Sequence, residues 1–254
     1  MSGYHGKFVW YDAMTSDLKA AETFYKAVIG WNMVDAGMPD RKYTLLSAGA
    51  VMVGGLMPVP EGVDAKPCWF GYIGVDDVDE YAARVVKAGG AIHREPSDIP
   101  NVGRFAMAAD PHGAVFILFK GTGSEAPASP APGTPGHTGW HELHAGNMES
   151  DFAFYASLFG WTKAEAIDMG PMGTYQLFAT GGAPVGGMMN KMPQIAHPFW
   201  LYYFNVDAVS AGIDRVAKAG GKLLMGPQEV PGGMWIAQCL DPQGAMFAIL
   251  SSQR

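Results

Sequence analysis

The chain has 254 residues, of which 48% are hydrophobic and 16% are charged. This composition can fill one large or two ordinary packed domains and argues against disorder. A net charge of −7 argues against a nucleic-acid-binding protein, which needs a basic face. No apolar run approaches the roughly 18–20 residues of a membrane span, and the N-terminus lacks a signal-peptide pattern. We therefore expect a cytoplasmic protein with no membrane or nucleic-acid partner.

An internal repeat organises the sequence. Residues 69–119 align without a gap on 200–250 after a shift of 131, and 19 of the 51 positions are identical. Upstream the shift is 130, which aligns Trp10 with Trp140 and Trp31 with Trp161. The chain is therefore a tandem duplication, and the two copies are predicted to share one fold.

A segment of low complexity separates the two copies. Residues 121–136 contain four prolines, four glycines and no large apolar side chain. We expect an extended, poorly packed linker there, because it offers nothing to bury. The predicted domains are residues 3–120 and 138–254, joined by a linker over 121–137.

In chain order, each copy alternates one strand, one helix and three strands, twice over. Asp17 is predicted to cap the first helix and Gly30 to end it, and Asp76 to cap the second. The two cysteines, Cys68 and Cys239, form neither a disulfide framework nor a metal cluster. The strands expected in the first copy are 8–14, 31–35, 43–48, 51–57, 69–75, 92–95, 104–108 and 114–119.

Four short motifs recur in order in both copies and carry a resemblance to a known family. In the first copy they are Phe24-Tyr25 with Gly30-Trp31, Val75-Asp76, Ala88-Gly89-Gly90 and Asp110-Pro111, and they recur within 154–161, 206–209, 219–221 and 241–244. This ordered set resembles the vicinal oxygen chelate superfamily, also called the glyoxalase/bleomycin resistance/dioxygenase superfamily. The chain is most similar to its tandem two-domain, glyoxalase-like members. The resemblance implies an α+β fold of two domains, each with two βαβββ units that form cup-shaped mixed sheets.

The resemblance also implies four metal-ligand positions in each cup, which metalloenzymes of the family fill with His, Glu or Gln. Here these positions hold side chains that cannot ligate a divalent metal. We therefore expect neither a family-type metal centre nor another cofactor. The residues concerned are Trp10, Gly54 or Gly55, Phe70 and Ile117 in the first copy, and Trp140, Gly186 or Gly187, Leu201 and Ala248 in the second.

The first strand of each copy is predicted to direct a tryptophan and a carboxylate into its cup. Alternation places Trp10, Asp12 and Met14 on one face, and Trp140, Glu142 and His144 on the equivalent face. The carboxylates could be satisfied by backbone donors at a wet rim. Alternatively, Asp12, Glu142 and His144 bind or deprotonate a ligand, and these three are the candidate catalytic residues.

Other candidates for ligand contact are aromatic or apolar. Glycines flanked by methionines, such as Gly54-Gly55 and Gly186-Gly187, are expected to leave volume for an apolar or aromatic ligand. His141 and His144 point to opposite strand faces, so a helical zinc-protease motif is rejected, and His112 is interpreted as a turn residue. The predicted ligand-contact set is Trp10, Met14, Tyr43, Phe70, Tyr72, Trp140, Tyr175, Leu201 and Tyr203.

Two classes of function fit these observations. The first is a metal-independent protein that sequesters a small, partly aromatic or natural-product-like ligand, similar to bleomycin resistance proteins. The second is a metal-independent lyase, isomerase or hydroxylase-like enzyme acting on a small carbonyl or natural-product substrate, with Glu142 and His144, or Asp12, as general base. A structural or regulatory role is a third possibility. The expected partner is a small molecule, and the expected state a monomer or homodimer.

Overall fold

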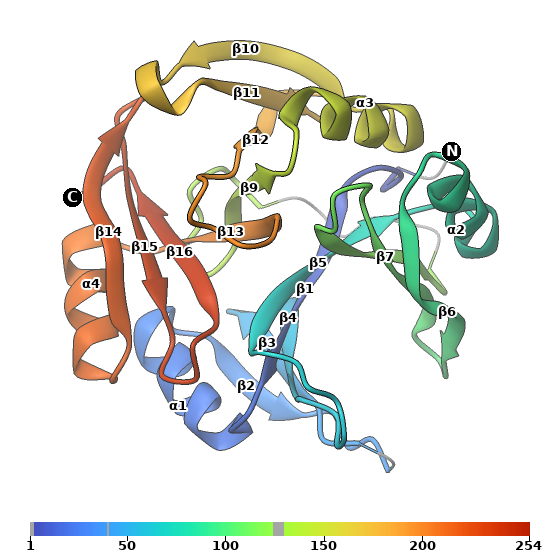
Figure 1. The fold of residues 1–254 in the computed structure, drawn as a ribbon. Coiled ribbons are helices and arrows are strands. Elements are labelled where there is room, and N and C mark those ends of the chain that lie inside the picture. The colour runs from blue at the N-terminus through green and yellow to red at the C-terminus, as the bar shows by residue number, and fades with distance from the viewer. Residues whose placement is uncertain (1–2, 40, 124–129) are drawn as a thin grey trace. The chain divides into compact units, whose positions relative to one another are not determined.

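Each copy of the repeat folds into two βαβββ modules in the computed structural model, which describes residues 3–39, 41–123 and 130–254 (Figure 1). The elements of the first repeat are β1 (Phe8–Thr15), α1 (Leu18–Val28), β2 (Asn32–Asp35), β3 (Thr44–Ala48), β4 (Val51–Pro58), β5 (Cys68–Gly74), α2 (Val78–Lys87), β6 (Ala91–Ile99), β7 (Gly103–Ala109) and β8 (Val115–Gly121). Those of the second are β9 (Thr138–Ala145), α3 (Met148–Phe159), β10 (Thr162–Asp168), the 3₁₀ turn η1 (Gly170–Met172), β11 (Thr174–Ala179), β12 (Pro184–Asn190), β13 (Phe199–Asn205), α4 (Val209–Lys218), β14 (Lys222–Val230), β15 (Met234–Leu240) and β16 (Met246–Ser251).

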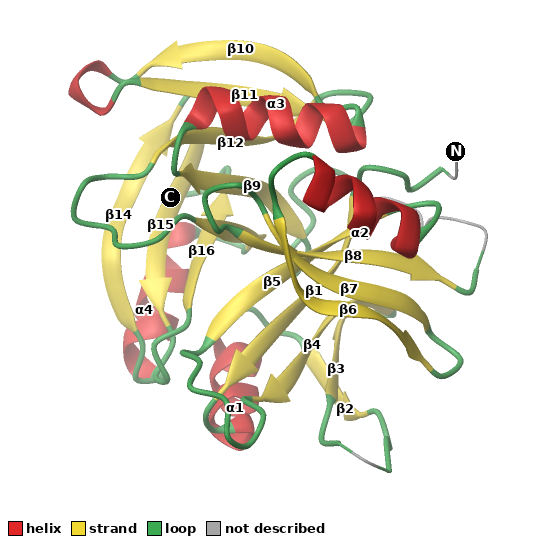
Figure 2. Ribbon diagram, turned by 45° about the vertical axis from the view of Figure 1, so that its right-hand side comes forward, coloured by secondary structure: helices red, strands yellow, loops and turns green. Residues whose placement is uncertain are grey.

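Each repeat contributes one eight-stranded mixed sheet. The strand order is β2-β3-β4-β1-β5-β8-β7-β6 in the first sheet and β10-β11-β12-β9-β13-β16-β15-β14 in the second. Strands β10, β11 and β12 can be followed side by side in Figure 2. The pairs β1/β4, β5/β8, β9/β12 and β13/β16 are parallel, and the last three strands of each module pair antiparallel in succession. The predicted α+β class and the repeated βαβββ modules are therefore confirmed.

Aspartate side chains cap the N-termini of α1 and α2. Asp17 accepts the backbone N–H of Ala20 at 3.0 Å and begins α1, as predicted. The prediction of Asp76 as the cap of α2 is wrong by one residue, because Asp77 accepts the N–H of Glu80 at 2.9 Å. Capping at Asp77 sets the register that buries the apolar face of α2, which consists of Val78, Tyr81, Ala82 and Val85.

The contacts of the chain group it into two compact units that do not coincide with the two repeats. Among the described residues, unit 1 comprises 3–10, 70–123 and 140–200, and unit 2 comprises 11–69, 130–139 and 201–254, without residue 40. The boundaries fall inside β1, β5, β9 and β13. Each unit thus combines a module from one repeat with a module from the other.

An aromatic core fills the interior of each unit. In unit 1, where α2 and α3 contact one another, Phe116 packs edge-to-face against Phe159. In unit 2, where α1 and α4 are in contact, Phe24 packs edge-to-face against Phe247. Such ring pairs contribute about 0.5–1.5 kcal/mol beyond their buried area.

A buried Trp–Tyr–Asp chain joins the two repeats within each unit. In unit 1 the indole N–H of Trp200 donates to Tyr155 Oη at 3.0 Å, and Tyr155 donates to Asp110 Oδ2 at 3.2 Å. The equivalent residues of unit 2 repeat the arrangement: Trp69 donates to Tyr25 at 2.9 Å, and Tyr25 to Asp241 at 3.0 Å. The recurring Tyr and Asp-Pro motifs of the sequence are therefore the contact between modules of different repeats.

Unit 1 carries an extra polar pair at this junction. His112 bonds through Nδ1 to Asp151 Oδ1, and the other oxygen of Asp151 accepts the N–H groups of Gly146 and Asn147. His112 lies in the turn before β8, as interpreted from the sequence, and its bond to Asp151 ties this turn to α3. Gln243 and Ala21 stand at the equivalent positions of unit 2.

The linker departs from expectation at its C-terminal end. Residues 124–129 lie outside the described residues. Gly136, however, is buried, donates its N–H to Asn205 O at 2.8 Å and accepts the indole N–H of Trp31 at 2.7 Å. The expectation that nothing here is buried is wrong, because it considered side chains and not the backbone groups that a glycine exposes to a neighbour. Gly6 makes the matching contact with Trp161 in unit 1.

No helix in the part of the chain that the structure describes has the length and apolar character needed to cross a membrane.

Because each unit contains a module from both repeats, we expect that neither repeat folds stably without the other. Chains 1–123 and 130–254, produced together, should co-purify as a one-to-one complex, because each unit needs a module from both. Either fragment alone should lack dispersed NMR spectra as a monomer, since Tyr155 or Asp110 would lose its buried partner. A folded, stable monomer of either fragment would contradict this organisation.

The junction also predicts a pH dependence. Burial, and then the neighbouring Asp151 carboxylate, raise the pKa of Asp110 from 3.8 to about 6. A carboxyl whose pKa is raised on folding stabilises the protein while it is protonated, and this contribution is lost as the pH rises through the folded-state pKa. The free energy of unfolding of the wild type, minus that of Asp110→Asn, should therefore fall between pH 4 and pH 7 in urea titrations. A difference that grows over this range would refute the assignment.

Candidate functional site

Strand β9 of unit 1 carries the three residues predicted to share one face of the second cup. Glu142 and His144 are buried, with side chains 10% and 9% exposed, and Trp140 is half-buried. Bulk solvent therefore surrounds neither titratable side chain. Burial of a carboxylate requires partners, because an unpaired buried charge costs several kcal/mol.

These partners form a continuous network. The indole N–H of Trp140 donates to Tyr175 Oη at 2.8 Å, and Tyr175 donates to Glu142 Oε2 at 3.0 Å. The other carboxylate oxygen, Oε1, lies 2.9 Å from His144 Nε2. Burial and the adjacent Glu142 carboxylate raise the pKa of Tyr175 well above 10, which keeps its hydroxyl a donor at neutral pH. Four of the predicted site residues are thus brought together.

Tyr175 reaches Glu142 across an intervening strand. Tyr175 is on β11, Glu142 is on β9, and Gly187 of β12 lies between them, in register with Glu142. A Cβ at Gly187 would overlap the ring of Tyr175. The expectation that this glycine leaves room for a ligand is therefore wrong: the ring of Tyr175 fills the space, and glycine is needed for that ring to cross the strand.

The His144 ring stacks on Phe199, with ring centroids 4.5 Å apart and planes at 6°. Phe199 is half-buried at the start of β13 and was not among the predicted residues. Comparison of the repeats could have found it, since Met14 and Cys68 stand where His144 and Phe199 stand in the second repeat.

His141 lies on the opposite face of β9, as alternation predicts. Its ring stacks on Phe8 at 4.2 Å, and its Nδ1 lies 2.7 Å from the carbonyl oxygen of Val185. Burial lowers the pKa of His141 to about 4, so it stays neutral at physiological pH. This histidine packs in the core of unit 1 and takes no part in the network.

Unit 2 contains a shorter version of the network. Tyr43 donates to Asp12 Oδ1 at 2.7 Å, and its ring lies over Gly55, which is in register with Asp12. Met14 takes the place of His144 and is buried. The polar pair therefore occurs in both repeats, but the titratable imidazole occurs in one.

The remaining predicted residues pack in apolar surroundings. In unit 1, Trp10 and Phe70 pack against a buried cluster that contains Tyr72. In unit 2, Leu201 and Tyr203 are almost fully buried, and the hydroxyl of Tyr203 accepts a hydrogen bond from Gln238 Nε2 at 2.9 Å. Their buried contacts assign them to the core, and contact with a ligand stays a prediction.

The side chains do not fit the divalent metal of the family's metalloenzymes. The four family positions hold tryptophan, glycine, bulky apolar residues and alanine, which offer no metal ligand. Within residues 3–39, 41–123 and 130–254, no three His, Cys, Asp or Glu side chains come together in a way that could hold a metal ion.

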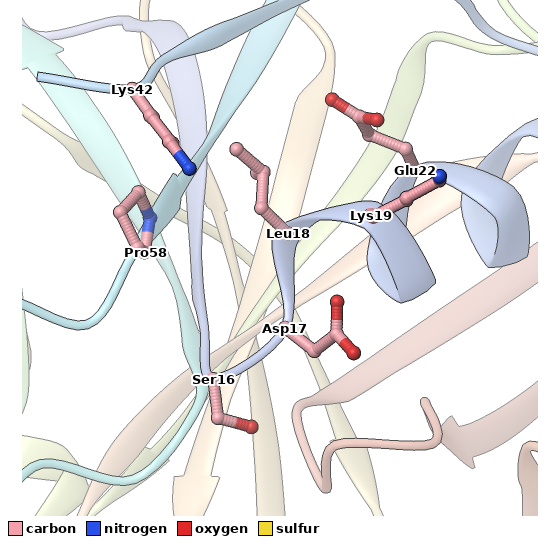
Figure 3. A pocket seen from close by; sticks show the side chains of 7 residues that line it. All are labelled: Ser16, Asp17, Leu18, Lys19, Glu22, Lys42 and Pro58. Carbon is pink, nitrogen blue, oxygen red and sulfur yellow. The ribbon is translucent and has the colours of Figure 1, made fainter.

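A surface depression of about 490 Å³ in unit 2 lies beside the first turn of α1 (Figure 3). Two of its polar side chains serve the fold: Asp17 caps α1, and Glu22 accepts a hydrogen bond from the hydroxyl of Thr44 at 2.6 Å. None of the predicted site residues lines it. The lining consists of Ser16, Asp17, Leu18, Lys19, Glu22, Lys42 and Pro58.

Comparison with known families settles the relationship that the motifs suggest. The glyoxalase/bleomycin resistance protein/dioxygenase superfamily matches residues 7–118 and again 134–249. The chain belongs to this superfamily. The glyoxylase-like protein CFP32 of Mycobacterium bovis is 31% identical over 95% of this chain and 93% of its own length. The anthracycline biosynthesis protein DnrV of Streptomyces peucetius is 29% identical over 96% and 93%, respectively.

Solved structures agree with the fold of this superfamily member. The Mn(II)-bound glyoxalase of Novosphingobium aromaticivorans matches all of this chain and 84% of its own, with a TM-score of 0.71 and 18% identity. The 2,3-dioxygenase LapB of Pseudomonas sp. KL28 matches 96% of this chain and 91% of its own, with a TM-score of 0.66 and 14% identity. At these identities the likeness concerns the fold alone.

The strand-crossing tyrosine gives a direct prediction. Gly187→Ala should displace the Tyr175 ring, break its bond to Glu142 and lower the free energy of unfolding by about 1–3 kcal/mol. NMR spectra of ring-labelled tyrosine, assigned with Tyr175→Phe, should show the Tyr175 signal move. Gly55→Ala is the matched control and should move the Tyr43 signal only. An unmoved Tyr175 signal in Gly187→Ala would show that the glycine is not required.

Proposed function

We propose that the network on β9 binds a small, partly aromatic ligand without a metal. The observation that carries this proposal is the buried Glu142–His144 pair, bordered by the half-buried rings of Trp140, Tyr175 and Phe199. The rings offer flat apolar surface, and the carboxylate offers a charge-assisted hydrogen-bond acceptor. Together they provide the mixture of apolar wall and few polar groups that is typical of small-molecule sites.

Comparison of the two repeats at the position of His144 favours a functional role for this histidine. A buried polar pair such as Glu142 and His144 is weak support for stability, because apolar residues of similar volume often do as well. The first repeat folds with Met14 at the position of His144, so this fold does not require a histidine there. The presence of an imidazole at position 144 is best explained by a ligand that binds to the site of the second repeat and not to that of the first.

The relatives support the aromatic character of the ligand. DnrV, and DauV of Streptomyces sp. strain C5, are both named for anthracycline biosynthesis, and both align with 96% of this chain. Anthracyclines are polycyclic aromatic natural products, a chemistry suited to stacking on Trp140 and Phe199.

An enzymatic role is the second candidate, favoured by the 2.9 Å separation of Glu142 Oε1 and His144 Nε2. This separation is within the range found for a general base and the group that orients it. In such a reaction one of the two removes a proton from a small carbonyl or natural-product substrate, as in a lyase or isomerase, while the other balances the charge. Asp12, held by Tyr43, is the corresponding base of unit 2.

Binding of 2-hydroxyanthraquinone, measured by calorimetry, tests the proposal. Trp140→Ala should weaken the affinity about 2- to 10-fold through lost aromatic contact, and Glu142→Gln by about 10-fold or more through a lost charged acceptor. Asp12→Asn is the matched control and should leave the affinity unchanged. If both unit 1 variants bind normally while Asp12→Asn does not, the ligand site is not on β9.

A single-turnover assay separates binding from catalysis. If bound 2-hydroxyanthraquinone is recovered unchanged, and a panel of carbonyl-bearing aromatic compounds gives no product, the binding role stands. A product whose formation is slowed about 100-fold by Glu142→Gln would favour the enzyme.

A further inference from the structure

His144 is the one member of the β9 network whose hydrogen-bonding capacity is not used. The indole N–H of Trp140 donates a hydrogen bond to the hydroxyl of Tyr175, and this hydroxyl donates one to Glu142. By contrast, both ring nitrogens of His144 are buried, and neither makes an aligned hydrogen bond to any described residue. Nε2 lies 2.9 Å from Glu142 Oε1, a close polar contact that is not aligned as a hydrogen bond.

The two nitrogens have different surroundings. Nε2 faces the oxygen Oε1 of Glu142, and a carboxylate accepts hydrogen bonds, so the imidazole proton is favoured on Nε2. Nδ1 then presents a lone pair, an acceptor that the described residues leave without a donor. A buried polar atom of this kind is costly in the free protein and calls for a partner.

The position of the ring is fixed while this acceptor stays unused. Phe199 stacks face-to-face on the imidazole at 4.5 Å, and Glu142 holds its other edge. A fixed acceptor bordered by aromatic surface suits a donor attached directly to a flat ring.

We infer that His144 determines the specificity of the ligand site: its Nδ1 accepts a hydrogen bond from a hydroxyl group on an aromatic ring of the ligand. This inference rests on the ligand site proposed above. The hydroxyl proton stays shared between ligand oxygen and Nδ1, and Nε2–H remains directed toward Glu142. A site built around an unpaired buried acceptor discriminates against analogues that lack the donor, because the acceptor then stays unsatisfied. The aryl methyl ether of the same ligand is such an analogue.

The test compares 2-hydroxyanthraquinone with 2-methoxyanthraquinone, which has the same ring system but no hydroxyl donor. The wild type should bind the hydroxyl compound about 10-fold or more tightly than the ether. His144→Met, which places the first repeat's residue at this position, should abolish this preference. Far-UV circular dichroism and a cooperative thermal unfolding transition should show that the variant is folded.

The outcomes separate this inference from the proposed function. If the wild type binds both compounds equally well and Trp140→Ala weakens both, the ligand site stands, and Nδ1 is satisfied by water and not by the ligand. A preference that survives in His144→Met also overturns the inference. If the wild type binds neither compound, the proposed function fails together with it.

Discussion

The buried hydrogen bond from Tyr155 to Asp110 is the contact on which the rest of unit 1 depends. It joins the helix after β9 to the turn before β8, so a side chain of the second repeat satisfies a buried carboxylate of the first. The Asp110 carboxylate also accepts the N–H groups of His112 and Ala114, which fix its own turn. Because burial raises the cost of its charge, the loss of any one donor is expensive. The strand that carries Glu142 and His144 therefore lies in a unit that its own repeat cannot complete.

Gly55 and Gly187 have an equally specific role, because each leaves room for a tyrosine ring beside a buried carboxylate. In each repeat a tyrosine crosses one strand to reach a carboxylate on the next, over Gly55 in one case and Gly187 in the other. Any larger side chain at these positions would block the ring. The same fold thus supports Asp12 with Met14 in one repeat and Glu142 with His144 in the other.

The sequence predicts the modules well, because local signals define them: alternation, helix caps and a repeat of 130–132 residues. It cannot tell which modules pack together, since Tyr25 and Tyr155, like Asp110 and Asp241, are identical in both copies and fit either pairing. Alternation also places Glu142 and His144 on one face. The reach of Tyr175 depends on the order β11-β12-β9, and the stacking of Phe199 depends on its approach to His144, so neither follows from spacing along the chain.

A crystal structure of the protein soaked with 2-hydroxyanthraquinone tests the central claim most directly, namely that the β9 network is the ligand site. The account predicts a ring system in contact with Trp140 or Phe199, with the hydroxyl oxygen within about 3.2 Å of His144 Nδ1. A ligand found instead in the depression beside α1, lined by Ser16 and Lys42, would contradict it. A ligand that contacts Asp12 and Tyr43 but leaves Glu142 untouched would do so equally.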